Sequence, residues 1–168
     1  MRRLNLGCGD DYREGWVNID INPDVKADIH RDLNKGLPFD DNSVDEVWCS
    51  HLLEHLDDMI FAMEEIYRVM KPNAPITIRF PYCNSPSAWN DPTHKRALNP
   101  NTFKWFEEGD YWNGKNKIRA KFKKFELFHV PSPQFEQDFH TKGLNEQQKI
   151  FYYGGVIEFI LKSKAVKQ

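Results

Sequence analysis

The chain has 168 residues, a length that suits one domain of ordinary size and argues against two full domains. Hydrophobic residues make up 40% and charged residues 29% of the chain, a mixture that can bury a core and that argues against a disordered, collagenous or membrane-spanning protein. The formal net charge of −2 gives no indication of a polyanionic partner.

The small net charge hides two unlike halves. Residues 1–80 carry a formal charge of −7 and residues 81–168 a charge of +5. Most of the aromatic residues lie in the second half. We therefore expect one domain, 1–168, whose two halves have different roles.

Targeting and disulfide signals are absent from the sequence. Arg2 and Arg3 are followed by no long apolar stretch, and no segment approaches the ~18 apolar residues of a membrane span. Cys8, Cys49 and Cys83 are odd in number and form no CxxC pair, which suits a reducing compartment. We expect a cytoplasmic protein without a membrane span.

The first half alternates between predicted strands and other elements. Short β-type runs lie at 3–6, 16–20, 27–33 and 44–50. Apolar residues then recur at three- and four-residue spacing from Leu52 to Met70, which predicts a helix with Asp57 as N-cap and a stop at Lys71 and Pro72. A fifth strand is predicted at 75–80. This order favours a parallel α/β sheet with its ligand at the carboxyl ends of the strands.

The second half is predicted to add a helix and two strands. Asn99 and Pro100 suit the start of a helix that ends near Gly109. From Lys115 to Lys124 basic residues alternate with apolar ones, which predicts a strand with one basic face. That face suits an anionic acceptor, but an edge strand protected by lysines explains it at least as well. Residues 156–162 read as the last strand.

A glycine turn and two carboxylates follow the first three strands. Gly7, Cys8 and Gly9 allow a tight turn and close approach of a ligand. The dinucleotide fingerprint would need a glycine where Tyr12 stands, which disfavours NAD. Asp20 can accept hydrogen bonds from a ribose diol, and Asp32 can lie beside a purine amino group. Each alone is also typical of a solvated strand end, but together they describe an adenosine-type pocket.

In these features the sequence resembles the class I S-adenosylmethionine-dependent methyltransferases. The segments that carry the resemblance are LNLGCGD at 4–10, NID at 18–20, LPFDDNSVDEV at 37–47, SHLLEHL at 50–56 and YRVMKPN at 67–73. It is strongest to the short predicted type linked to sugar or polysaccharide modification, which has a motif like DPTHKR at 91–96. Two departures are a missing helix before the first strand and Asn73–Ala74 in place of a glycine pair.

The resemblance implies a three-layer, Rossmann-like α/β sheet, mostly parallel, with an antiparallel final strand and a contracted second crossover. Residues 1–80 would bind S-adenosylmethionine and residues 81–168 the acceptor. The turn would pass beneath the methionine part of the cofactor, Asp20 would bind the ribose, and Ser50 and His51 would lie near the sulfonium. The cofactor-binding residues implied are Asn5, Gly7, Cys8, Gly9, Asp20, Ile21, Asp32, Leu33, Ser50 and His51.

The acceptor side is expected on loops after the fourth and fifth strands, because methyl transfer mainly requires alignment and, for a hydroxyl, a base. We interpret His94 as the general base, oriented by Asp91, with His51 as a further catalytic candidate. The alternative is a turn at 91–93 with His94 bonded to backbone. Acceptor-binding candidates are Tyr82, Trp89 and Arg96.

A metal site is not predicted. His55 follows His51 by four residues, but the sequence assigns no further ligand, so a packed or surface histidine is the expectation.

The sequence thus predicts an S-adenosylmethionine-dependent methyltransferase that acts on a hydroxyl of a small molecule or saccharide. An RNA or DNA methyltransferase is the alternative enzyme, favoured by the basic run and the aromatic residues. Against it, no Asn or Asp followed by Pro, Pro and an aromatic residue comes after the fourth strand. A third hypothesis is a non-catalytic module that binds the cofactor. The sequence leaves the oligomeric state open.

Overall fold

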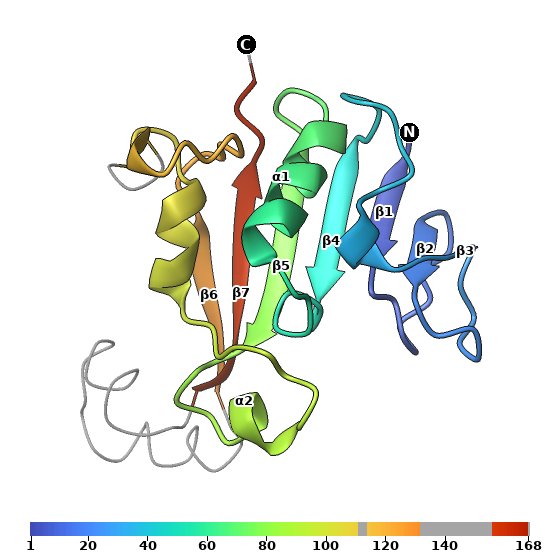
Figure 1. Cartoon of the computed structure of the whole chain (residues 1–168), viewed down its shortest axis with the longest axis vertical. Helices are drawn as coiled ribbons and strands as arrows, with labels where there is room; N and C mark the ends of the chain where they lie inside the picture. Colours follow the sequence, from blue (N-terminus) through green and yellow to red (C-terminus); the bar gives the residue numbers. More distant parts are fainter. Residues whose placement is uncertain (111–113, 132–155, 168) are drawn as a thin grey trace.

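A seven-stranded mixed sheet forms the centre of the molecule (Figure 1). The computed structural model describes residues 1–110, 114–131 and 156–167. The strand order is β3-β2-β1-β4-β5-β7-β6. The strands are β1 (Arg3–Leu6), β2 (Val17–Asp20), β3 (Ile29–His30), β4 (Glu46–Ser50), β5 (Pro75–Pro81), β6 (Glu126–Pro131) and β7 (Val156–Lys164).

The direction of the strands confirms the predicted fold class. Neighbours among β1 to β5 pair in parallel, whereas β7 lies antiparallel to both β5 and β6. The parallel strands therefore end at one edge of the sheet, where α/β proteins bind their ligands. No helix within the described ranges is long and apolar enough to cross a membrane.

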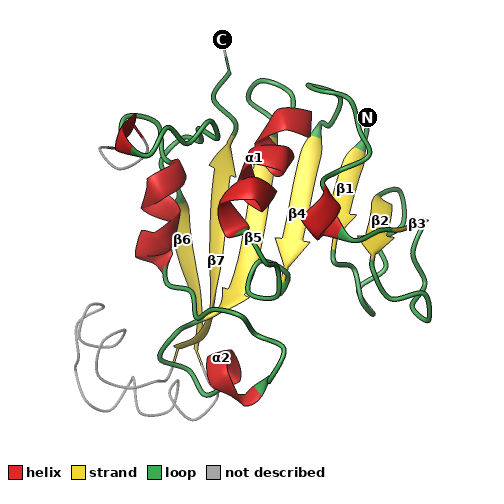
Figure 2. Cartoon of the chain, viewed as in Figure 1, coloured by secondary structure: helices red, strands yellow, loops and turns green. Residues whose placement is uncertain are grey.

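One face of the sheet packs against helix α1 (Met59–Val69), as Figure 2 shows. Every second residue of β4 and β5 is buried on this face, and α1 contributes a buried stripe to the same core. The helix begins one residue later than predicted, because Asp58 rather than Asp57 is the N-cap. Its Oδ1 accepts a hydrogen bond of 2.9 Å from the Phe61 amide.

The crossover between β2 and β3 is short, as predicted, and the crossover between β1 and β2 is short as well. Residues 7–16 and 21–28 form turns and bends with no helix, so the helices that a three-layer fold places there are not formed by these segments. The third strand is shorter than the predicted 27–33. Asp32 instead caps the 3₁₀ helix η1 (Leu33–Lys35), with its side chain accepting from the Asn34 amide at 3.0 Å.

The predicted basic strand is wrong. Ile118, Ala120 and Phe122 are buried and the residues between them are exposed, so the alternation itself is correct. Only Phe122 forms β-bridges, however, to Glu107 and to Ala165. Lys117 lies in the left-handed region at φ +55°, which interrupts an extended ladder, and β6 takes the position beside β7.

Aromatic residues from the second half complete the core. The predicted helix after Asn99 is the 3₁₀ helix η2 (Pro100–Phe106), with the Asn99 side chain accepting from the Asn101 amide. Phe103 and Phe106 are buried, and the Phe103 ring lies 4.9 Å from that of Phe80. A further short helix, α2 (Ser87–Asn90), lies beyond the carboxyl end of β5 (Figure 1).

Candidate functional site

A pocket of about 490 Å³ lies at the carboxyl ends of β1, β2 and β4, a volume in the range of small-molecule sites. Its walls come from the glycine turn, the end of β2, η1 and the loops after β4 and β5. The lining residues are Gly7, Gly9, Asp20, Ile21, Arg31, Asp32, Leu33, Asn34, His51, Leu52, His55, Leu56, Thr93 and Lys95. The fold therefore brings most of the predicted cofactor residues into one cavity.

The glycine turn needs glycine for two different reasons. Gly7 has φ +64°, and a Cβ there would lie 3.1 Å from Leu52 Cδ1. Gly9 has φ +45°, and a Cβ there would meet no atom within 4 Å. Gly7 therefore permits close packing with the loop after β4, whereas Gly9 leaves open space on the pocket side for a ligand to approach the backbone.

Asp20 is fixed at the end of β2 by the backbone around it. Its Oδ2 accepts a hydrogen bond of 2.8 Å from the Gly9 amide, and its Oδ1 accepts one of 2.9 Å from the Asn22 amide. Each carboxylate oxygen can accept more than one hydrogen bond, so acceptor capacity remains for a ligand diol. The residues present thus fit the ribose of an adenosine cofactor.

Three predicted cofactor residues lie outside the pocket lining. Asn5 is buried behind the turn, where its Nδ2 donates to Asn18 Oδ1 at 3.0 Å and to the Asp11 carbonyl at 2.6 Å. Cys8 is buried as well, and that burial raises the pKa of its thiol. Ser50 is the last residue of β4, half-buried and paired in register with Arg79. Asn5 and Cys8 support the turn from the core side.

His51 joins the pocket to the last strand of the sheet. It adopts φ +50° directly after β4, and its Nε2 lies 3.3 Å from Glu158 Oε1 and its Nδ1 lies 3.4 Å from Glu54 Oε1. The Glu158 carboxylate, and after it that of Glu54, raise the pKa of His51 to about 9. The imidazole is therefore protonated at neutral pH and cannot accept a proton there.

The loop after β5 forms a turn at 91–93 with His94 bonded to backbone, the alternative to a catalytic role for His94. Asp91 Oδ1 accepts from the Thr93 amide at 2.8 Å and from the Thr93 hydroxyl at 2.6 Å, which lowers the pKa of Asp91. His94 Nδ1 lies 2.9 Å from the Ala88 carbonyl oxygen, and its Nε2 is 3.8 Å from Asp91 Oδ2. A backbone carbonyl, more than Asp91, thus orients this imidazole.

The three predicted acceptor residues differ in their surroundings. The Arg96 guanidinium donates to the carbonyls of Leu53 and Asp57 at 3.0 and 2.8 Å, so it fixes the loop after β4. Tyr82 is buried, with its ring 4.9 Å from that of Phe159. Trp89 is 69% exposed, and its indole nitrogen donates to the Cys83 carbonyl. Trp89 alone of the three presents a large free surface.

Several lining residues were not predicted from the sequence, because a motif does not show which of its side chains face a pocket. The residues concerned are Arg31, Asn34, Leu52, Leu56, Thr93 and Lys95. For His55 the sequence predicts a packed or surface histidine. Its position beside the pocket depends on how the loops after β4 and β5 fold against each other.

Comparison with known proteins supports the nature of this pocket. Residues 4–78 match the methyltransferase domain family. The match spans β1 to β5 and the glycine turn, and it makes this part of the chain an enzyme domain whose implied cofactor is S-adenosylmethionine. No curated protein matches the chain.

Solved structures share the fold of this chain at low identity. A SAM-dependent methyltransferase from Archaeoglobus fulgidus has a TM-score of 0.72 and 22% identity, over 97% of this chain and 85% of that one. The YcgJ protein from Bacillus subtilis has a TM-score of 0.61 and 16% identity, over 99% and 92%. The [4+2]-cyclase SpnF has a TM-score of 0.63 and 17% identity, over 99% and 76%. Such likeness shows a common fold and leaves the acceptor open.

Proposed function

We propose that this chain transfers a methyl group from S-adenosylmethionine to a hydroxyl oxygen of a small molecule or saccharide. The observation that carries the proposal is the pairing of the glycine turn with the Asp20 carboxylate in a pocket of about 490 Å³. When bound, S-adenosylmethionine supplies an electrophilic methyl group. Asp20 would hold the ribose hydroxyls, Ile21 and Leu33 would pack on the adenine, and Asp32 would accept from its amino group.

The acceptor would enter from the side of α2. Trp89 supports this assignment, because an exposed indole on the loop after β5 offers an apolar face on which a sugar ring can stack. His51 is positively charged at neutral pH and would act through its charge. A base role for His94 would have to use Nε2, because its Nδ1 faces the Ala88 carbonyl.

A nucleic-acid acceptor is less well supported. Two cations of the basic run are paired with carboxylates. The Arg119 guanidinium is paired with Glu64 at 2.7 Å, and Lys123 Nζ lies 3.7 Å from Glu108. Strong RNA binding that weakens steeply with salt would nevertheless favour that alternative.

The experiment is a transfer assay with labelled S-adenosylmethionine over nucleotide sugars, polysaccharide fragments and RNA. Label on a saccharide hydroxyl is the expected result. Label on RNA alone would move the proposal to the nucleic-acid class. Cofactor binding without transfer to any acceptor would favour a non-catalytic module.

The compartment of the enzyme and the division of labour between its two halves also belong to the proposed function. We infer a cytoplasmic enzyme of one domain, in which residues 1–80 bind the cofactor and residues 81–168 the acceptor. The free thiols of Cys8, Cys49 and Cys83 support a reducing compartment.

A further inference from the structure

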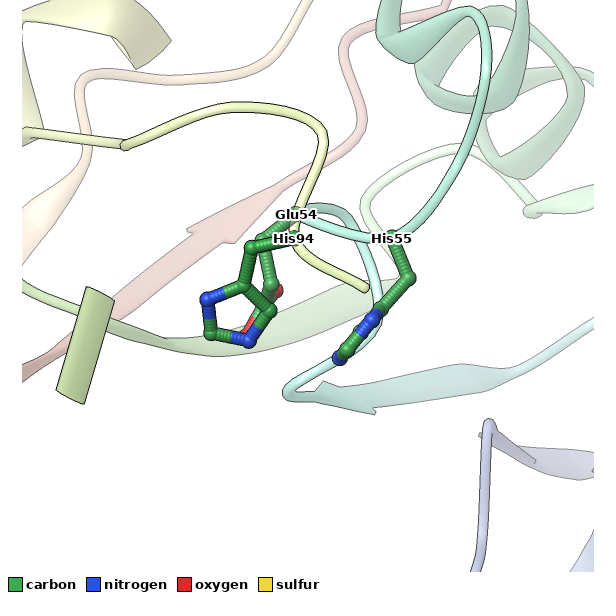
Figure 3. A group of neighbouring side chains, drawn as sticks. All are labelled: Glu54, His55 and His94. Atoms are coloured by element: carbon green, nitrogen blue, oxygen red, sulfur yellow. The ribbon is translucent and has the colours of Figure 1, made fainter. Parts of the chain in front are cut away.

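Two loops are joined beside the cofactor pocket, and the junction brings two histidines together. The Lys95 amide donates to the Glu54 carbonyl at 2.8 Å, and the Arg96 guanidinium donates to carbonyls of the same loop. His94 is thereby held next to Glu54 and His55, and the two imidazole rings lie 4.6 Å apart (Figure 3). Candidate ligand atoms of Glu54, His55 and His94 all lie within 4.8 Å of one another.

Hydrogen bonds fix which nitrogen of each histidine carries its proton. The Ala88 carbonyl can only accept, so His94 Nδ1, 2.9 Å away, is the protonated nitrogen of the neutral ring. The Thr93 hydroxyl donates to Asp91, so it accepts from His55 Nδ1 at 3.0 Å. Both rings therefore keep the Nε2 lone pair for a ligand. An outer acceptor on the other nitrogen is typical of histidines that bind metals.

Glu54 supplies an anionic partner that the surrounding protein does not satisfy. Its side chain is fully buried, and neither carboxylate oxygen has a hydrogen-bond partner within the described residues. The nearest charge is His51 Nδ1, 3.4 Å from Oε1, a distance at which the charges attract without a well-formed hydrogen bond. His51 compensates the negative charge in part, but the two buried oxygens still lack the close contacts that a bound cation would supply.

We propose that Glu54, His55 and His94 form a binding site for a divalent transition-metal ion of the Zn²⁺ class. Two imidazole nitrogens and one carboxylate oxygen are a ligand set that Zn²⁺ uses when it keeps a position open for water or substrate. Mg²⁺ and Ca²⁺ prefer oxygen ligands and fit this set poorly. Ligand atoms around a tetrahedral Zn²⁺ lie about 3.4 Å apart, so small side-chain rotations would close the site on the ion.

This site competes with the base role considered for His94. A metal ion would occupy the Nε2 lone pair that the base would need, so the two assignments exclude each other. His55 and Thr93 also line the cofactor pocket, which places the ion at the edge of the proposed methyl-transfer site. The metal proposal stands on its own ligands and does not require the proposed acceptor.

The test is a metal titration of the full chain without a polyhistidine tag, after removal of metal by a chelator. We expect one equivalent of Zn²⁺ by calorimetry and visible absorption bands with Co²⁺, and no response to Mg²⁺. Glu54→Gln, His55→Ala and His94→Ala should each weaken Zn²⁺ binding at least tenfold. Thr93→Val, which removes the outer acceptor of His55 together with the hydroxyl bond to Asp91, should weaken it by roughly tenfold. His30→Ala, on exposed β3, should bind Zn²⁺ as the parent does.

Circular dichroism of each variant separates ligand loss from unfolding, and His55→Ala, at the pocket surface, is the substitution least disruptive to the core. Zn²⁺ binding that survives unchanged in folded His55→Ala and His94→Ala would overturn the proposal. Absence of Zn²⁺ binding to the parent chain would do the same and would leave Glu54 as the buried counterion of His51. Neither result depends on methyl transfer.

Discussion

The Gly9 amide donates a hydrogen bond of 2.8 Å to Asp20 Oδ2, and this contact joins the turn after β1 to the carboxyl end of β2. Gly9 lies in a tight turn with a positive φ, and Asp20 is the last residue of a strand that pairs with β1. Both ends of the contact are therefore fixed before a ligand binds. A pre-formed carboxylate of this kind binds a diol at a low entropic cost.

Alanine at Gly7 and at Gly9 should have different effects. Both substitutions place a side chain at positive φ, which costs about 1 kcal/mol. Gly7→Ala also presses on Leu52, so we expect a loss of about 2 kcal/mol in the free energy of unfolding. Gly9→Ala has room in the free protein and should mainly weaken S-adenosylmethionine binding. Denaturant unfolding and calorimetry measure the two effects, and a Gly9→Ala protein with parental cofactor affinity would argue against this pocket.

The ion pairs of His51 should make stability depend on pH. The pKa of His51 is raised from 6.5 to about 9 in the folded chain, so its stabilising contribution is complete below pH 6.5. The contribution is lost as the pH rises through about 9, because the folded state then gives up its extra proton. His51→Gln should show a flatter dependence of the unfolding free energy across this window, with His30→Gln as control. Equal slopes for parent and His51→Gln would contradict the assignment.

More of the predicted cofactor residues than of the predicted acceptor residues line the pocket, for a physical reason. Gly7, Gly9 and Asp20 follow strands whose ends meet at one sheet edge, so their convergence follows from local pattern and topology. His55 and His94 come together through contacts between two loops, such as the hydrogen bond from Lys95 to Glu54. The spacing of residues in the sequence does not predict such contacts.

The alternation from Lys115 to Lys124 correctly predicted which residues are buried but not the element. A period of two describes any extended segment, paired or unpaired. The hydrophobic pattern does not show that β6 takes the position beside β7, which depends on tertiary packing. Nor does it show that Lys117 adopts a left-handed backbone conformation.

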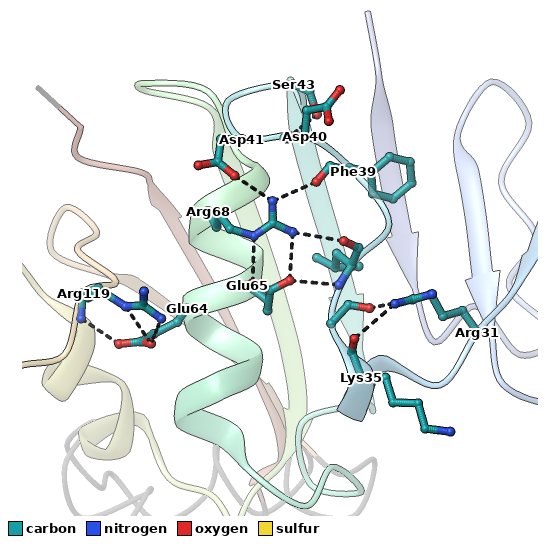
Figure 4. Close-up of polar contacts among 12 residues, drawn as sticks. Arg31, Lys35, Phe39, Asp40, Asp41, Ser43, Glu64, Glu65, Arg68 and Arg119 are labelled. Atoms are coloured by element: carbon teal, nitrogen blue, oxygen red, sulfur yellow. Dashed lines mark hydrogen bonds and ion pairs between the residues drawn. The ribbon is translucent and has the colours of Figure 1, made fainter.

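Arg68 should be important for stability, whereas Arg119 should not. The Arg68 guanidinium binds both oxygens of Glu65, Asp41 and the carbonyls of Leu37 and Phe39, which ties the segment before β4 to α1 (Figure 4). Arg68→Ala should therefore cost about 2 kcal/mol of unfolding free energy.

Arg119→Ala provides the matched control. Arg119 pairs with Glu64, which lies on α1 as Arg68 does, but the Arg119 side chain is 79% exposed. Removal of this side chain should therefore leave the unfolding midpoint unchanged. Denaturant curves of both variants measure the difference. A parental unfolding midpoint for Arg68→Ala would show that the contacts of Arg68 with the 37–41 segment contribute little.

Asp20 is proposed to anchor S-adenosylmethionine, and calorimetry of the cofactor with Asp20→Ala measures its contribution. The control is Asp24→Ala, an exposed carboxylate on the following loop that does not line the pocket. Loss of hydrogen bonds to a charged acceptor predicts binding roughly 10- to 100-fold weaker for Asp20→Ala and parental binding for Asp24→Ala. Equal affinity of the parent and a folded Asp20→Ala protein, or no binding by the parent, would show that Asp20 does not anchor the cofactor.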